Sequence, residues 1–235
     1  MAGLIARYDL SKRNISFDFY AWQTHAWLLG YREIVFKISD GYGQHREPQD
    51  VLARRYQSIV KPGPDMIGMP WREGDDGEEC ASHYLQWIVQ TWNWDFPRLK
   101  SVKPAGTARY TVTLRNVPMH VRRNSNAPMW RKFAKEIGAT VIEDWHDQPI
   151  DLYDRMALYA GAKMNFGVVN GPMGMLMLSK YPMQMWDCGD VADRWAKHGV
   201  QAGTQLPWFL PGQSLVWERP TVGDLMAAVN RIEKC

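Results

Sequence analysis

The residues with the clearest chemical potential form a basic loop in the second half of the chain. Arg115, Arg122 and Arg123 fall in one short segment, with His120 between them. Arginine binds phosphate groups through paired N–H donors that match two phosphate oxygens. We therefore expect this loop to bind a nucleoside diphosphate, although a solvated basic loop would carry the same residues.

A tight turn further along the chain is the second candidate for binding an anion. Residues 163–169 are apolar and predict a strand, Asn170-Gly171 is a turn dipeptide, and Pro172 suits the first position of a helix over residues 172–179. Such a turn points backbone N–H groups and the positive end of the helix dipole at the space above it. A phosphate or diphosphate would fit there, and a plain turn between two packed elements is the alternative.

Carboxylates follow several of the expected strands, and a carboxylate at a cleft can act as a general base on a hydroxyl nucleophile. Asp9 and Asp40 are equal first candidates for this base in the first half, and Asp144 and His146 rank after them. Loop aspartates also make turns and cap helices, so each has a structural alternative. Glu218 follows the last expected strand, where it could bind a ribose diol or form a surface salt bridge.

The elements that must position these residues alternate along the whole chain. Alternating and β-branched runs predict strands over residues 4–8, 33–38, 66–70, 109–114, 140–143, 163–169, 181–186 and 214–217. Helical spacing predicts helices over residues 17–29, 49–59, 81–90, 129–137, 151–160, 172–179, 191–198 and 221–232. We expect the acidic residues 75–79 to be a solvated helix start and Gly161 to adopt the left-handed conformation after a helix.

Repeated strand–helix–strand units specify parallel sheets with helices on both faces. Pro104-Ala105-Gly106 is the best candidate boundary. We therefore expect an α/β protein with two Rossmann-like halves, residues 1–104 on the acceptor side and residues 105–235 on the donor side. Ligands of such sheets bind beyond the carboxyl ends of the strands, so the loops listed above should meet there.

Composition limits the class of protein further. The 235 residues are 46% hydrophobic and 23% charged, which is ordinary for a globular protein. A net charge of +3 is too small to imply a polynucleotide-binding surface. Without an apolar run of roughly eighteen residues or a secretory signal pattern, we expect a cytoplasmic protein with no membrane span.

Metal and cofactor motifs are missing from the sequence. Cys80, Cys188 and Cys235 form no CxxC pair and are expected to be reduced thiols, and Cys80 with His83 supplies only half of a zinc motif. No Asp-x-Asp, GxGxxG, GxxxxGK(S/T) or GxSxG motif occurs. We therefore expect neither a metal nor a cofactor.

The segments RNVPMHVRRNSN, residues 115–126, and RMALYAGAKMNFGVVNGPM, residues 155–173, resemble the donor half of two-domain glycosyltransferases of the GT-B type. They are most similar to fucosyltransferase-like and glycosyltransferase-like proteins of bacteria and phages, over residues 107–186, and residues 1–60 resemble the N-terminal part of those proteins. The resemblance implies sugar transfer from a nucleotide-activated donor, without an obligatory metal, at a cleft between two Rossmann-like halves. It places on the donor Arg115, Arg123 and Asn126, and in the diphosphate-facing turn Asn170, Gly171, Pro172 and Met173.

We therefore expect a metal-independent glycosyltransferase that moves a sugar from a nucleotide-diphosphate donor to a hydroxyl of a glycan or other acceptor. Asp9 or Asp40 would be the base, and the donor would contact Arg115, Arg122, Arg123, Asn126, Asp144, Asn170, Gly171, Pro172, Met173 and Glu218. Two alternatives remain open. One is a non-catalytic module that binds a nucleotide or a glycan. The other is an enzyme that glycosylates modified DNA bases, which the arginines and aromatic residues permit but do not indicate.

Overall fold

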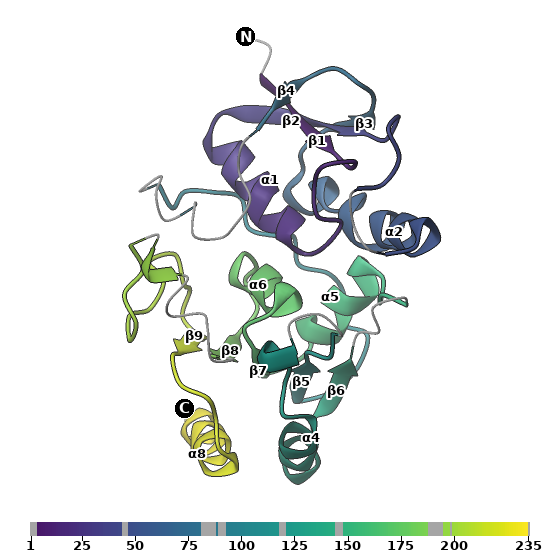
Figure 1. Ribbon diagram of the computed structural model, residues 1–235. Coiled ribbons are helices and arrows are strands. Elements are labelled where there is room, and N and C mark those ends of the chain that lie inside the picture. Colours follow the sequence, from purple (N-terminus) through teal and green to yellow (C-terminus); the bar gives the residue numbers. More distant parts are fainter. Residues whose placement is uncertain are drawn as a thin grey trace.

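The computed structural model describes residues 4–43, 47–80, 88, 93–117, 121–143, 148–187, 195–197 and 199–234. Over these residues the chain forms one sheet of four strands and one of five, and every strand pairing is parallel. Helices connect many of the strands (Figure 1). The α/β class with two Rossmann-like halves is therefore confirmed. The helices expected over residues 81–90 and 191–198 lie largely outside the described residues.

The N-terminal sheet has the strand order β3-β2-β1-β4. Its strands are β1 (Leu4–Asp9), β2 (Tyr31–Lys37), β3 (Trp71–Glu73) and β4 (Glu78–Glu79). Helix α1 (Asp18–Leu28) joins β1 to β2, and α2 (Gln49–Arg55) continues into a π-helical turn, η1 (Tyr56–Val60). Because β1 lies between β2 and β4, its carboxyl end is central in this half.

Two predicted elements of the N-terminal half are wrong. Residues 66–70 do not form a strand, because Pro64–Ile67 is a 3-10 turn, η2, which ends at Gly68 with φ of 69°. A proline at the start and a left-handed glycine at the end favour a helical turn. The acidic residues are not a helix start either, because Glu78 and Glu79 pair with Ala6 and Arg7 along the open edge of β1.

The C-terminal sheet has the strand order β6-β5-β7-β8-β9. Its strands are β5 (Tyr110–Leu114), β6 (Thr140–Glu143), β7 (Met164–Val168), β8 (Met183–Trp186) and β9 (Gln213–Val216). Its helices are η3 (Val121–Arg123), α4 (Ala127–Glu136), α5 (Leu152–Ala160), α6 (Gly171–Met177) and α8 (Val222–Glu233). The chain moves outward from β5 to β6 and then returns to the other side of β5 with β7. The strand order therefore reverses between β5 and β7, and ligands of such sheets bind beyond the carboxyl ends of the strands at a reversal of this kind.

Most helix ends follow the chemistry of the sequence. The Asp151 side chain accepts the N–H of Tyr153 at 2.9 Å and caps α5, and Thr221 forms a capping box with Asp224 at the start of α8. Gly161 differs from the prediction, because its φ of −87° and ψ of −11° are right-handed. A Cβ at this position would lie 2.9 Å from the backbone oxygen of Gly106. A glycine is therefore needed there for a close approach of two backbones.

The two halves are in direct contact. Figure 1 shows the N-terminal half next to α5 and α6, whereas α4 and α8 lie on the far side of the C-terminal sheet. The connecting segment is bound to both halves, since the N–H of Leu99 donates to the Leu178 carbonyl at 2.9 Å and that of Lys100 to the Met66 carbonyl at 2.7 Å. The domain boundary at residue 104 stays a prediction, with one sheet ending at Glu79 and the other beginning at Tyr110.

Each half has an aromatic core against its sheet. In the N-terminal half Tyr8 lies edge-on to Phe19 and Trp22, with ring centroids 4.9 Å and 4.7 Å apart. In the C-terminal half Phe133 of α4 meets Phe166 of β7 at 5.3 Å. These cores hold the strands rigidly, so the strand ends are fixed platforms for the loops that follow them. None of the helices in the described ranges is long and apolar enough to cross a membrane.

Candidate functional site

Asp9 is the last residue of β1 and the better enclosed of the two candidate bases. It is 2% exposed, and its Oδ1 accepts hydrogen bonds from the Ser11 N–H at 3.0 Å and the Ser11 hydroxyl at 2.6 Å. The ammonium groups of Lys12 and Lys37 each lie 3.7 Å from its Oδ2. Burial by itself would raise the pKa of Asp9, but the Ser11 hydrogen bonds and the charges of Lys37 and Lys12 outweigh it and lower this pKa. Asp9 is therefore ionised at neutral pH and weakly basic.

Asp40 lies on the same edge of the sheet, in the turn after β2. Its side chain is exposed and forms a hydrogen-bonded ion pair with Lys37. Lys37 therefore lies between the two candidate bases, and the structure brings Asp9 and Asp40 together as the sequence predicts. The two carboxylates differ in environment, because only Asp9 is buried.

The arginine loop, residues 115–126, begins where β5 ends and folds back on itself. The Arg115 N–H donates to the Ser125 hydroxyl at 2.9 Å, and the Arg115 carbonyl accepts the Ser125 N–H at 3.0 Å. The Asn124 side chain bridges the N–H and the carbonyl of Val117 at 3.1 Å and 2.9 Å. These bonds hold the start and the end of the loop together at the carboxyl edge of the sheet.

The predicted donor residues of this loop differ in exposure. Arg115 and Arg123 are half-buried, and Arg122 is exposed. Asn126 is the N-cap of α4, with its Oδ1 accepting the Met129 N–H at 3.4 Å. Asp144, which sequence reasoning also placed on the donor, lies outside the described residues, as do His120 and His146.

The loop after β9 reaches the arginine loop. The Nη2 group of Arg219 donates to the backbone carbonyl of Arg122 at 3.1 Å. Glu218 is exposed and directly precedes Arg219, so the predicted Glu218 lies in the loop whose arginine reaches Arg122. Sequence reasoning missed Arg219, although a basic residue just after a strand end was a usable signal.

The turn after β7 is more enclosed than the sequence suggests. Asn170 is 7% exposed and Met173 is fully buried. The Asn170 side chain accepts the Met173 N–H at 2.9 Å, and its carbonyl accepts the Gly174 N–H at 2.8 Å. Pro172 has no N–H, and the N–H groups of Met173 and Gly174 are already bonded within the turn, so these three residues offer no backbone donor to a ligand. Its assignment to the diphosphate stays a prediction.

Arg155 of α5 is a second residue that sequence reasoning missed. It is fully buried and donates from Nη1 to the Tyr159 hydroxyl at 3.2 Å, which is in turn hydrogen-bonded to the Thr113 hydroxyl at 3.0 Å. Its guanidinium also lies over the Phe17 ring, 5.2 Å from the centroid. The signal was its spacing, because Leu152, Arg155, Met156 and Tyr159 form one helical stripe that must face inward.

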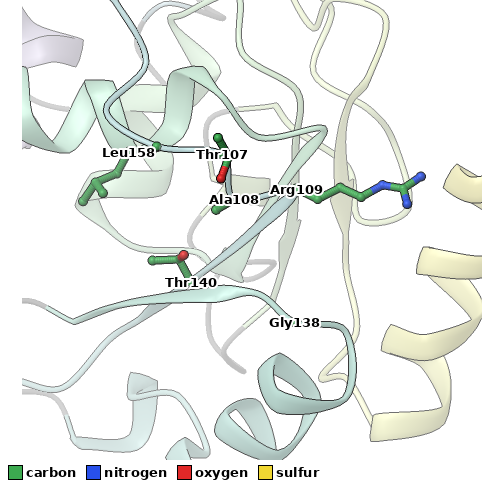
Figure 2. A pocket seen from close by; sticks show the side chains of 7 residues that line it. Thr107, Ala108, Arg109, Gly138, Thr140 and Leu158 are labelled. Carbon is green, nitrogen blue, oxygen red and sulfur yellow. The ribbon is translucent and has the colours of Figure 1, made fainter.

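A hollow of about 530 Å³ lies at the amino ends of the C-terminal strands, opposite the arginine loop. It is lined by Gly106, Thr107, Ala108, Arg109, Gly138, Thr140 and Leu158. These residues lie just before β5, at or just before the start of β6, or late in α5. Figure 2 shows the Arg109 side chain pointing away from the hollow, and its guanidinium pairs with Glu233. The hollow is therefore separate from the arginine loop.

Comparison with known proteins adds no further constraint, because no family model, curated protein or solved structure matches the chain. Function must therefore be argued from the two carboxyl edges themselves.

Proposed function

We propose that this protein is a glycosyltransferase of the GT-B type that uses a nucleotide-diphosphate sugar as donor. The observation that carries the proposal is the position of the arginine loop at the carboxyl end of β5, where the order of the C-terminal strands reverses. Parallel sheets bind phosphorylated ligands at such reversals. Several guanidinium groups at that point suit a diphosphate.

The reaction is a displacement at the anomeric carbon of the sugar. The acceptor oxygen forms a bond to that carbon while the bond to the diphosphate oxygen breaks, and the nucleoside diphosphate leaves with the bonding electrons. Arg115, Arg122 and Arg123 stabilise the charge that develops on the leaving group. The acceptor proton passes to a carboxylate, and Asp9 and Asp40 are the candidates from the N-terminal half.

A donor-cleavage assay tests this proposal. A panel of UDP-, GDP-, ADP- and dTDP-sugars is incubated with the protein and simple glycan acceptors, with EDTA present, and the released nucleoside diphosphate is measured. We expect release from one donor class, and we expect Arg123→Ala to remove it. No release from any donor would contradict the proposal.

The two candidate bases can be separated in the same assay. We expect either Asp9→Asn or Asp40→Asn to abolish turnover while donor binding stays intact. Full activity of both variants would remove the N-terminal carboxylates from the mechanism.

A non-catalytic nucleotide- or glycan-binding module is the second candidate function. One observation favours it, because Asp9 and Asp40 are both already engaged by lysines. Calorimetric binding of a nucleotide sugar without any turnover in the acceptor panel would select this alternative.

A further inference from the structure

Phe17 lies between the two halves, where it contacts helices α5 and α6 of the C-terminal half. Its ring lies on the Arg155 guanidinium, with the centroid 5.2 Å from Cζ. A Cβ added to Gly171 would come within 2.8 Å of the Phe17 Cβ. Phe17 therefore touches both α5 and the start of α6, although it comes from the loop after β1.

Capping of α1 does not require the Phe17 side chain. Phe17 has the helical dihedral angles φ −61° and ψ −11°, and the preceding Ser16 hydroxyl caps the helix by accepting the Asp18 N–H at 3.2 Å. The Phe17 side chain makes no capping hydrogen bond and contacts the other half.

Arg155 lies at a position suited to a phosphate ligand. Its hydrogen bond to Tyr159, and that of Tyr159 to Thr113, place it beside the carboxyl end of β5. The same strand end carries the arginine loop and lies at the point where the strand order reverses between β5 and β7. A guanidinium at this point can meet two phosphate oxygens of a ligand held by the arginine loop.

We propose that Arg155 is a phosphate-binding residue of this site and that Phe17 is a displaceable plug over it. The inference rests on the proposed function, because the ligand is taken to be a nucleoside diphosphate. On binding, the Phe17 ring leaves the guanidinium and a phosphate oxygen takes its place, so a charge-assisted hydrogen bond replaces a cation–π contact.

Calorimetric titrations with UDP, GDP, ADP and dTDP test the plug in a series of side chains at position 17. We expect Phe17→Ala to tighten the Kd of the bound nucleotide by about fivefold to thirtyfold, the range of a lost cation–π contact, with Phe17→Leu between it and the wild type. Phe36→Leu is the matched control for Phe17→Leu, because it makes the same substitution at a fully buried phenylalanine of the N-terminal core. The control should lower the melting temperature without changing the Kd.

A second variant tests the arginine. Arg155→Lys keeps the charge but loses the paired donors, so we expect Phe17→Ala combined with Arg155→Lys to bind no tighter than the wild type. If Arg155→Lys does not fold, the graded series at position 17 still decides.

The outcomes separate this inference from the proposed function. A folded Phe17→Ala protein with an unchanged or weaker Kd overturns the plug while the proposed function stands. If neither the wild type nor Phe17→Ala binds any of the four nucleotides, both fail.

Discussion

The two halves carry the same kind of sheet, yet their carboxyl edges have opposite chemistry. At the N-terminal edge a buried carboxylate, Asp9, is held by Ser11 and lies between two lysines. At the C-terminal edge a folded loop carries several arginines. The shared architecture fixes where the two carboxyl edges lie, and the side chains determine the charge that each edge presents. The arginines of the C-terminal edge suit an anion, and we propose that the N-terminal edge receives the acceptor.

The largest expected effect is on the C-terminal edge. Arg123→Ala should weaken nucleoside diphosphate binding roughly tenfold to a hundredfold, because a hydrogen bond to a charged group contributes about 1.5–3 kcal/mol. Calorimetry measures the Kd, and circular dichroism checks the fold. Arg54→Ala is the matched control, since Arg54 is an exposed arginine of α2 paired with Asp50. Equal affinities of Arg123→Ala and the wild type would remove this loop from the site.

The contact between the two halves at Gly171 and Phe17 should be sensitive to a single added methyl group. Gly171→Ala forces its Cβ against Phe17 and should lower the free energy of unfolding by about 1–3 kcal/mol, as overpacking does. Urea unfolding measures the change. Gly223→Ala is the control, because a Cβ at Gly223 would meet only the Thr221 hydroxyl, at 3.6 Å, and we expect this substitution to be neutral or slightly stabilising. A Gly171→Ala protein as stable as the wild type would mean that the halves separate easily.

Asp9→Asn should lower the free energy of unfolding by about 1–3 kcal/mol at neutral pH. The substitution replaces a buried carboxylate that accepts two hydrogen bonds from Ser11. The folded-state pKa of Asp9 is lowered. Its stabilisation is therefore fully present above the unfolded pKa of about 3.9 and is lost as pH falls through the lower folded value. Unfolding free energies of both proteins against pH should converge in acid. A difference that grows in acid would reverse this assignment.

The smallest effect is expected at Asp40. Its ion pair with Lys37 is exposed, and exposed pairs contribute no more than about 1 kcal/mol. Asp40→Asn should therefore change the free energy of unfolding much less than Asp9→Asn does. If the two variants were equally destabilising, burial would not distinguish the two carboxylates.

Local chemistry in the sequence predicted most of the fold. The alternation of strands with helices depends on neighbouring residues and occurs as expected, and the side-chain caps at Asn126, Asp151 and Thr221 are equally local. The glycine at position 161 has a distant cause, because a side chain there would meet the backbone of Gly106, whereas the left-handed conformation expected of it does not occur. A contact across the chain leaves no periodic pattern in the sequence.

The candidate site was less accessible to sequence reasoning for the same reason. The arginine loop and the two carboxylates could be found because each follows a strand. Arg155 and Arg219 each had a local signal in the sequence, but their partners, Phe17 and the Arg122 carbonyl, are distant in the chain and could not be predicted from it. Strand order, which places the reversal between β5 and β7, is also set by non-local pairing.

Hydrogen–deuterium exchange with each nucleoside diphosphate of the panel at saturating concentration tests the central claim most directly, because it reports both edges at once. The account predicts slower amide exchange over residues 115–126 when the matching nucleotide is added, with little change over residues 9–16 beyond that caused by movement of Phe17. Protection confined to residues 9–16, or no protection with any nucleotide, would contradict a donor site on the C-terminal edge.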